Sequence, residues 1–215
     1  MMIELFFATK NRNKVHEIQA LLSGLPFELR SCLDEPQLPA ADEVGETLEE
    51  NALLKAELAV AQLGIPAFAD DTGLFVDALG GAPGIYAARY AGADATYRDN
   101  YEKLLRELEH VPDERRGAEF RCVIAFLVPD GSSLALPREV EVVQRAAARG
   151  FLARGAIRGA ITRSPSGAGG FGYDPVFFVP DAGCTFAELD GPQKNELSHR
   201  GRAVRHFVAG LSGMR

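Results

Sequence analysis

The sequence predicts an α/β fold, because short apolar runs typical of buried strands alternate with longer segments whose apolar residues recur at helical spacing. Apolar residues make up 47% of the 215-residue chain, which is enough for a sizeable core. A β-rich middle and a helical C-terminal segment indicate a mixed strand order rather than a strict alternation.

In the N-terminal part, residues 3–8 and 27–31 have strand character, and residues 13–23 between them have helical spacing. Gly24 follows this helix as a stop signal. A loop containing two prolines then leads to the next helix.

That next helix is predicted from Thr47, which with Glu50 forms the sequence pattern of a capping box. It should run to about Leu63 and end at Gly64. Residues 65–71 and 74–79 then read as two strands, followed by a glycine-rich turn, GGAPG.

Thr96 should cap a further helix that ends before Pro112. FRCVIAFLV and the segment after Ser132 read as strands joined by the turn PDG. A last strand is predicted at residues 176–179, and Ser198 should open a terminal helix. Its apolar face follows the i, i+3, i+4, i+7 pattern at Val204, Phe207, Val208 and Leu211.

Composition excludes several classes of protein. A formal net charge of −7 argues against a nucleic-acid partner, since phosphate neutralisation needs many cations. No apolar run approaches the roughly 20 residues that span a bilayer, and MMIELFFATK lacks the pattern of a secretory signal. We therefore expect a cytoplasmic protein with no membrane partner, whose three scattered cysteines serve as small buried hydrophobes.

Four segments concentrate chemistry-bearing residues. The first, ATKNRNK (residues 8–14), joins a strand to a helix N-terminus, where free backbone N–H groups favour anions. We interpret this junction as a phosphate site. The chain has only five lysines against 18 arginines, and Lys10 and Lys14 both fall here.

The second segment combines the helix ENALLKA with ADDTG. Asn51 and Lys55 are four residues apart and share one helix face. Taken alone, this helix favours a solvated edge, with the stem of Lys55 lying over apolar surface, and the acidic pair of the next segment shifts the interpretation toward a functional site. Asp70 and Asp71 are consecutive in a strand, so their side chains point to opposite faces and differ in role. One could hold a turn with Thr72, and the other could bind a metal or activate water.

The third and fourth segments are GAGGFGYDP (residues 167–175) and KNELSHRG (residues 194–201). Glycines allow close approach of a ligand, and Phe171 or Tyr173 offers a flat surface to a base. A glycine-rich hairpin and a surface charge cluster are the alternative interpretations of these two segments.

Together these segments resemble the inosine/xanthosine triphosphate pyrophosphatase family. ATKNRNK resembles that family's (S/T)xNxxK phosphate motif, and ENALLKA, ADDTGL with GGAPGIYAARYAG, GFGYDP and SHRG match its other motifs in order. The resemblance implies one domain over residues 1–215, with an elongated mixed β-sheet flanked by helices and two lobes with an active-site cleft between them. It also implies a homodimer and Mg²⁺-dependent hydrolysis of ITP, dITP and XTP to the monophosphate and pyrophosphate.

The resemblance further implies roles for individual residues. Asp71 would be general base and magnesium ligand, and Glu43, or its neighbour Asp42, would be the second metal ligand. Lys55 would be the other catalytic residue and would help to hold the triphosphate. Substrate binding would fall to Thr9, Lys10, Asn11, Arg12, Asn13 and Lys14 on the phosphate side, to Thr72, and to Phe171, Gly172, Tyr173, Asp174, Lys194, His199 and Arg200 on the base and sugar side.

Two departures from the family pattern stand out. Lys10 replaces a smaller residue, which either adds charge to the phosphate site or points to solvent. Between Phe120 and Gly159 the chain looks longer than usual, which we interpret as a hairpin insertion over about residues 137–154. Other open alternatives are a pyrophosphatase with a different base preference and a non-catalytic purine nucleotide-binding module.

Overall fold

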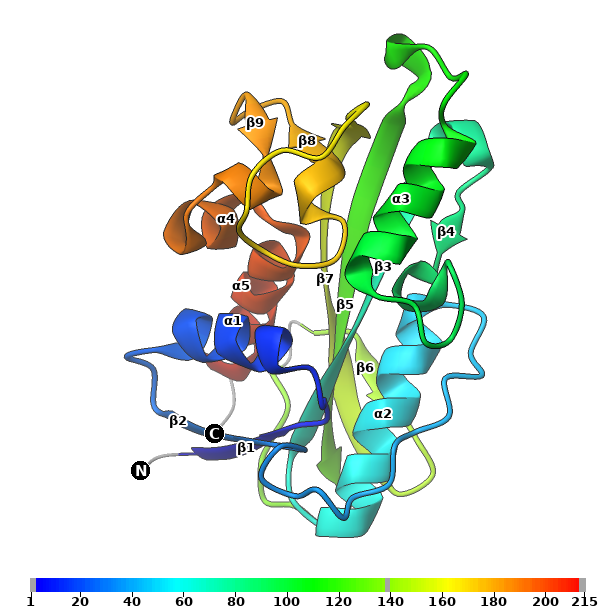
Figure 1. The fold of residues 1–215 in the computed structure, drawn as a ribbon. Helices are drawn as coiled ribbons and strands as arrows, with labels where there is room; N and C mark the ends of the chain where they lie inside the picture. The colour runs from blue at the N-terminus through cyan, green and yellow to red at the C-terminus, as the bar shows by residue number, and fades with distance from the viewer. Residues whose placement is uncertain (1–2, 138–139, 213–215) are drawn as a thin grey trace. The chain divides into compact units, whose positions relative to one another are not determined.

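The computed structural model describes residues 3–137 and 140–212, which form five α-helices and a nine-stranded sheet (Figure 1). Neighbouring strands follow the order β2-β1-β3-β5-β7-β8-β9, while β4 pairs with β3 and β6 with β7. This confirms the predicted mixed α/β class. The strands are β1 (Ile3–Phe7), β2 (Phe27–Ser31), β3 (Ala67–Val76), β4 (Pro83–Gly84), β5 (Gly117–Pro129), β6 (Val142–Gln144), β7 (Ala148–Ile161), β8 (Phe177–Val179) and β9 (Cys184–Thr185). The helices are α1 (Arg12–Leu22), α2 (Leu48–Leu63), α3 (Tyr97–Glu107), α4 (Gly191–Leu197) and α5 (His199–Ser212).

The N-terminal strands of the sheet are parallel. β1 lies between β2 and β3 and runs parallel to both, and α1 and α2 provide the crossovers that parallel pairing requires. Phe7 at the end of β1 is in register with Phe68 of β3, and the Ala8 N–H donates to the Phe68 carbonyl at 2.8 Å. The chain therefore leaves β1 beside the part of β3 that carries Asp70 and Asp71.

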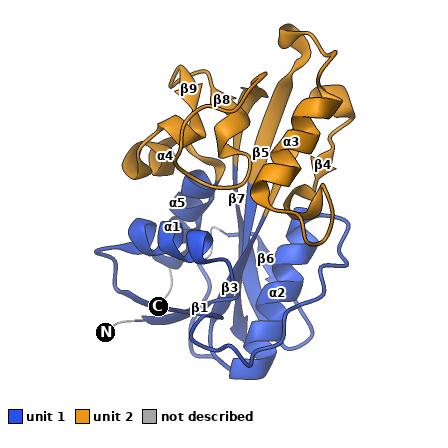
Figure 2. Ribbon diagram, viewed as in Figure 1, with its two compact units in different colours: residues 1–71, 122–155, 200–215 blue, residues 72–121, 156–199 orange. Residues whose placement is uncertain are grey.

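One compact unit comprises residues 1–71, 122–155 and 200–215 (blue in Figure 2). Within it, α1 and α5 lie on one side of the strands and α2 on the other (Figure 2). Buried apolar side chains of α1 and α5 pack against those of β3, β5 and β7; examples are Ile18, Phe207, Phe68, Phe126 and Phe151. The predicted apolar face of the terminal helix is confirmed by this packing.

The second unit comprises residues 72–121 and 156–199 (orange in Figure 2). Its core contains Phe120, Phe177 and Phe186, whose ring centroids lie 4.6 Å (Phe120 to Phe177) and 5.3 Å (Phe177 to Phe186) apart. Leu104 and Leu108 attach α3 and the turn after it to the same core. Thr96 caps α3, as predicted, and it also forms a complete capping box with Asp99.

Several local predictions were wrong. β3 does not end at Asp71: it continues without a break to Val76, because its second half pairs with β4. Gly73 permits the close approach of Gly84, whose carbonyl oxygen would lie 2.8 Å from a Cβ at Gly73. The glycine that suggested a turn therefore serves strand pairing.

The region after β5 also differs from the prediction. The PDG turn forms, with the Ser132 N–H donating to the Pro129 carbonyl, but β5 neighbours β7 rather than a strand directly after the turn. Residues 138–139 of the expected insertion over residues 137–154 lie outside the described residues. The rest of that segment contains β6 and the start of β7, paired antiparallel. That it is an insertion stays a prediction.

Smaller differences concern caps, a helix and a cysteine. Glu50 accepts from the Glu46 N–H rather than completing a capping box with Thr47, although Thr47 caps α2 as predicted. The short helix α4 precedes the terminal helix and was not predicted. Two of the three cysteines are buried as expected, whereas Cys184 is partly exposed.

Candidate active site

The junction between β1 and α1 is organised by side-chain caps. Asn11 is the N-cap of α1, and its Oδ1 accepts from the N–H groups of Asn13 at 3.0 Å and Lys14 at 3.3 Å. Thr9 Oγ1 accepts from the Asn11 N–H at 3.3 Å. This capping fixes the first turn of α1, the position where backbone N–H groups attract anions. The side chains of Lys10, Arg12 and Asn13 are exposed.

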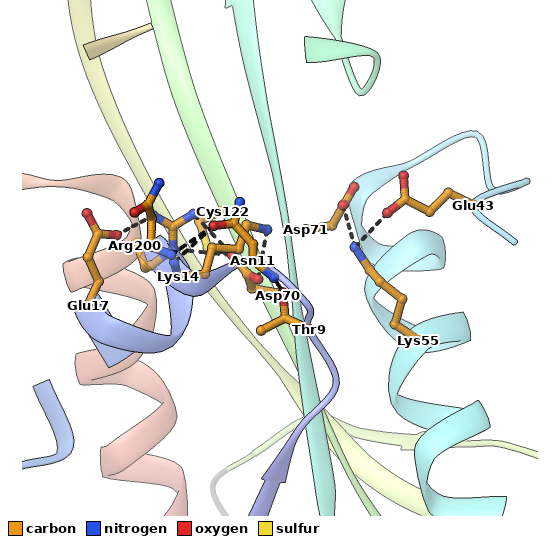
Figure 3. Close-up of polar contacts among 11 residues, drawn as sticks. Thr9, Asn11, Lys14, Glu17, Glu43, Lys55, Asp70, Asp71, Cys122 and Arg200 are labelled. Carbon is orange, nitrogen blue, oxygen red and sulfur yellow. Dashed lines mark hydrogen bonds and ion pairs between the residues drawn. The ribbon is translucent and has the colours of Figure 1, made fainter. Parts of the chain in front are cut away.

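Asp70 and Asp71 point to opposite sides of β3, as strand geometry predicted (Figure 3). Asp70 faces α1 and α5: Lys14 Nζ lies 2.8 Å from Asp70 Oδ1, and the Arg200 guanidinium donates twice to Asp70 Oδ2 at 3.2 Å. Arg200 also pairs with Glu17 of α1 at 2.5 Å. Two carboxylates and two cations from three elements, α1, β3 and α5, thus form one buried network.

The charge of Asp70 is strongly stabilised in this network. Its side chain is completely buried, which alone would raise the pKa of its carboxyl group. The positive charges of Lys14 and Arg200 outweigh this effect and hold the pKa of Asp70 well below its usual range. Burial likewise disfavours the charge of Arg200, but Asp70 and Glu17 raise its pKa above the ordinary value.

Asp71 faces α2 and the loop before it. Its Oδ1 accepts from Lys55 Nζ at 2.7 Å, and the same ammonium lies 3.2 Å from Glu43 Oε1 (Figure 3). Asp71 Oδ2 is buried and has no hydrogen-bond partner. Burial raises the pKa of Asp71 above its ordinary value, against the opposing attraction of Lys55.

Asn51 and Lys55, which share one face of α2, hold the loop before this helix in place. Asn51 is only 1% exposed, and its Oδ1 accepts from the Gly45 N–H at 2.9 Å. A Cβ at Gly45 would lie 2.8 Å from Asn51 Oδ1, so the loop packs closely against the helix at this point. The alternative of a solvated edge is therefore wrong: Asn51 anchors the loop that carries Glu43, and Lys55 pairs with that loop and with β3.

The residues around Asp71 fit a magnesium ion. Mg²⁺ prefers oxygen ligands and keeps waters or substrate phosphates in its shell, so one or two carboxylates suffice. Asp71 and Glu43 would supply them, and the unpartnered Oδ2 of Asp71 is an available oxygen ligand. Among the described residues no group of three or more His, Cys, Asp or Glu side chains could hold a metal ion. Glu43 and the other candidate ligand, Asp42, are both exposed, and the Glu43 carboxylate is the one that lies beside Lys55.

A second polar group lies in the other unit. Asp174 Oδ2 accepts from Lys194 Nζ at 2.7 Å and from the Phe171 N–H at 2.7 Å. The Lys194 ammonium also lies 4.8 Å from the centroid of the Phe171 ring, within cation–π range. Asp174 and Lys194 are 3% and 7% exposed, so this arrangement is a packed one rather than a surface charge cluster.

The other residues predicted to bind substrate together with Asp174 and Lys194 have different surroundings. Tyr173 is buried in the core, where its hydroxyl donates to the Ala87 carbonyl at 2.8 Å. The His199 ring stacks on Phe120, with centroids 4.5 Å apart. Gly172 adopts a φ of +65°, and Thr72 is partly exposed on β3.

Three residues that contact the predicted site residues were not predicted from the sequence. Asp70 was recognised as distinct from Asp71 but received no binding role. Glu17, which pairs with Arg200, and Tyr97, whose ring centroid lies 5.8 Å from that of Phe171, carried no sequence signal beyond residue type. Both contacts join segments distant in the sequence.

Comparison with known proteins decides the family. The model of the Ham1 family matches residues 5–210. The chain belongs to the Ham1 family. A dITP/XTP pyrophosphatase of Geobacter sulfurreducens is 49% identical over 203 residues, 94% of each chain, and that of Escherichia coli O157:H7 is 45% identical over 212 residues, 98% of each chain.

Solved structures of Ham1 proteins share the fold. A HAM1 protein from Coxiella burnetii has a TM-score of 0.82 at 39% identity, covering 98% of this chain and 99% of that one. The Staphylococcus aureus Ham1 protein has a TM-score of 0.80 at 35% identity, covering 98% of each chain. These matches confirm the family resemblance predicted from the five motifs. Among the described residues, no helix has the length and apolar character needed to cross a membrane.

Proposed function

We propose that this protein hydrolyses the deaminated purine nucleoside triphosphates ITP, dITP and XTP to the monophosphate and pyrophosphate, and so removes them from the nucleotide pool. Its relatives at 45–49% identity are named dITP/XTP pyrophosphatases. The structural observation that carries the proposal is Asp71, a buried carboxylate with one unpartnered oxygen beside an ammonium and a second carboxylate.

In the proposed mechanism Asp71 accepts a proton from a water molecule. The water oxygen attacks the α-phosphorus, a new P–O bond forms, and the bond from the α-phosphorus to the bridging oxygen breaks, so that pyrophosphate leaves with the electron pair. Lys14 and Lys55 would offset the negative charge of the phosphates as it redistributes. When Mg²⁺ is held by Asp71 and Glu43, it would polarise the phosphate oxygens and stabilise the leaving group.

Base preference would rest on hydrogen-bond donors. Hypoxanthine and xanthine present an acceptor at position 6, whereas adenine presents an amino donor. Lys194 carries only donors, so adenine would place donor against donor, and a site built for one pattern rejects the other by about 10⁴–10⁵-fold. Phe171, against which the Lys194 ammonium lies, would receive the base. The base-reading roles of His199 and Arg200 stay predictions; the Arg200 bonds described above go to Asp70 and Glu17.

Assembly and location complete the proposal. We infer a homodimer in the cytoplasm with no nucleic-acid partner, the last supported by the net charge of −7. Light scattering coupled to gel filtration would test the dimer: a mass near twice 23.2 kDa is expected, and a mass near 23.2 kDa would refute it.

The activity itself is tested by pyrophosphate release from ITP, dITP, XTP, dGTP, ATP and dUTP, each with and without Mg²⁺. Release chiefly from the first three, dependent on Mg²⁺, is expected. Release chiefly from another nucleotide would refute the base assignment and keep the chemistry. Absence of release from all six, with ITP still bound, would support a non-catalytic binding module instead.

A further inference from the structure

Lys55 occupies the position between the two carboxylates that would hold the metal. Its Nζ lies 2.7 Å from Asp71 Oδ1 and 3.2 Å from Glu43 Oε1. We infer that Lys55 is an internal counter-ion that competes with the divalent cation in the nucleotide-free protein and is released to the substrate phosphates when the metal binds. This inference rests on the proposed function, because it takes Asp71 and Glu43 as the metal ligands.

The first support is the charge of Lys55. Its side chain is only 14% exposed, and its ammonium lies within 3.2 Å of an oxygen of each carboxylate. The Lys55 ammonium therefore occupies the space between the two carboxylates and pairs with both. A divalent cation bound to the same two groups would be repelled by this ammonium at short range.

The second support is the remaining oxygen of Asp71. Lys55 satisfies Oδ1 only, and Oδ2 is buried without a partner. Leaving a buried acceptor unpaired is unfavourable, so the hydrogen-bonding capacity of Asp71 is only partly satisfied. An incoming metal would supply the missing partner, at the expense of the contact with Lys55.

The third support is the flexible stem of lysine. Lys55 lies on α2, and four methylene groups carry its ammonium. Rotation about these bonds can move the ammonium while the helix stays in place. Phosphate oxygens that arrive with the metal would offer it new acceptors. Metal and nucleotide would therefore bind cooperatively, each removing the obstacle to the other, and such coupling is reciprocal.

Mn²⁺, a spectroscopic substitute for Mg²⁺, tests this inference without catalysis. Free Mn²⁺ is measured by electron paramagnetic resonance during titration of the nucleotide-free protein and of Lys55→Gln. The variant keeps a hydrogen-bond donor of similar reach and loses the charge. We expect it to bind Mn²⁺ at least tenfold more tightly than the unmodified protein.

Lys103→Gln is the matched control for a change in overall charge. Lys103 lies on α3, where it donates to the Tyr90 carbonyl, and has no part in the proposed site. Its Mn²⁺ affinity should equal that of the unmodified protein. Lys55→Met, which removes the donor as well, provides a second test should the glutamine variant fold poorly by circular dichroism. Equal or weaker Mn²⁺ binding by the folded Lys55 variants would overturn the inference.

A double variant separates this inference from the metal assignment beneath it. Adding Asp71→Asn to Lys55→Gln should abolish the gain in Mn²⁺ affinity. If the double variant keeps the tighter binding, the metal does not use Asp71, and the metal assignment of the proposed function fails. If the gain is absent from Lys55→Gln while Asp71→Asn alone weakens Mn²⁺ binding, the metal assignment holds and only the competition by Lys55 is refuted.

Discussion

The carboxylates of Asp70 and Asp71, neighbours in β3, each pair with a lysine on a different side of the strand. Asp70 Oδ1 lies 2.8 Å from Lys14 Nζ of α1, and Asp71 Oδ1 lies 2.7 Å from Lys55 Nζ of α2. Asp70 is fully paired and its charge is stabilised, whereas Asp71 keeps one oxygen without a partner. The two positions should therefore respond differently to the same substitution.

Asp71→Asn should abolish turnover while nucleotide binding persists. Asparagine cannot accept the proton, and loss of a general base costs about 10²–10⁴-fold in rate. Pyrophosphate release gives kcat, and calorimetry of ITP binding to the variant, compared with the unmodified protein in chelator, gives affinity. Unchanged kcat would remove Asp71 from the mechanism.

Asp70→Asn should act mainly on stability. It leaves Lys14 and Arg200 facing a neutral amide in a buried network, and breaking such a pair costs about 3–5 kcal/mol. We expect a loss of stability at the lower end of this range, because Arg200 remains paired with Glu17. The control is Asp77→Asn: the Asp77–Arg158 ion pair is about half exposed on both sides, and such pairs contribute less than about 1 kcal/mol. Urea unfolding measures both variants, and equal losses would contradict the prediction.

The contribution of Asp70 should depend on pH in one direction. Its pKa is lower in the folded protein than in the unfolded chain, where it is about 3.9. The contribution is therefore fully present above about pH 4 and is lost as the pH falls below that value toward the folded pKa. The difference in unfolding free energy between the unmodified protein and Asp70→Asn should shrink by about 1.4 kcal/mol per pH unit below 3.9. Urea unfolding at pH 7 and pH 3 tests this, and a constant difference would argue against it.

Lys14→Ala should weaken triphosphate binding. The lost interaction is a charge-assisted hydrogen bond worth about 1.5–3 kcal/mol, which corresponds to a rise of about 10–100-fold in KM. Steady-state kinetics with ITP measures the change. Lys103→Ala is the control and should leave KM nearly unchanged, and equal losses in both variants would indicate general destabilisation instead.

Gly170→Ala should disturb the base-side group. A Cβ at Gly170 would lie 2.2 Å from Asp174 Oδ2, the atom that accepts from Lys194 and from the Phe171 N–H. We expect a higher KM for ITP and a smaller preference for ITP over ATP. Gly183→Ala is the matched control, because φ is +68° there against +69° at Gly170, yet no atom lies within 4 Å. Both variants carry backbone strain of about 1–2 kcal/mol, so only a difference in kinetics supports the prediction.

Local sequence signals predicted the regular elements well. β2, the caps of α2 and α3, and the apolar face of α5 follow from residue type and spacing alone. The continuous β3 could not be predicted in this way, because Thr72 and Gly73 favour a turn locally and the strand is extended by pairing with neighbouring strands, β4 among them.

The candidate site was predictable to a similar extent. Strand alternation predicted that the side chains of Asp70 and Asp71 point to opposite faces, and the family motifs predicted that Asp71 is the general base. The surroundings of Asp70 depend on Lys14 and Arg200, which are 56 and 130 residues away in the sequence. No local pattern reports a contact over such a separation, so the buried network was visible only in three dimensions.

The alternation of β3 also makes this protein intolerant of length changes. Two aspartates are adjacent in β3, and only odd or even position in the strand decides which one pairs with Lys14 and which one with Lys55. Deleting one residue of β3 before Asp70 would turn Asp71 toward Lys14 and bring Thr72 to the position opposite Lys55. Inserting one between Ala69 and Asp70 would turn Asp70 toward Lys55 and leave a residue without a carboxylate opposite Lys14 and Arg200. Either change leaves one of the two positions without a carboxylate, so short indels in this strand should impair the protein even where the fold survives, whereas substitutions at flanking apolar positions should be tolerated more often.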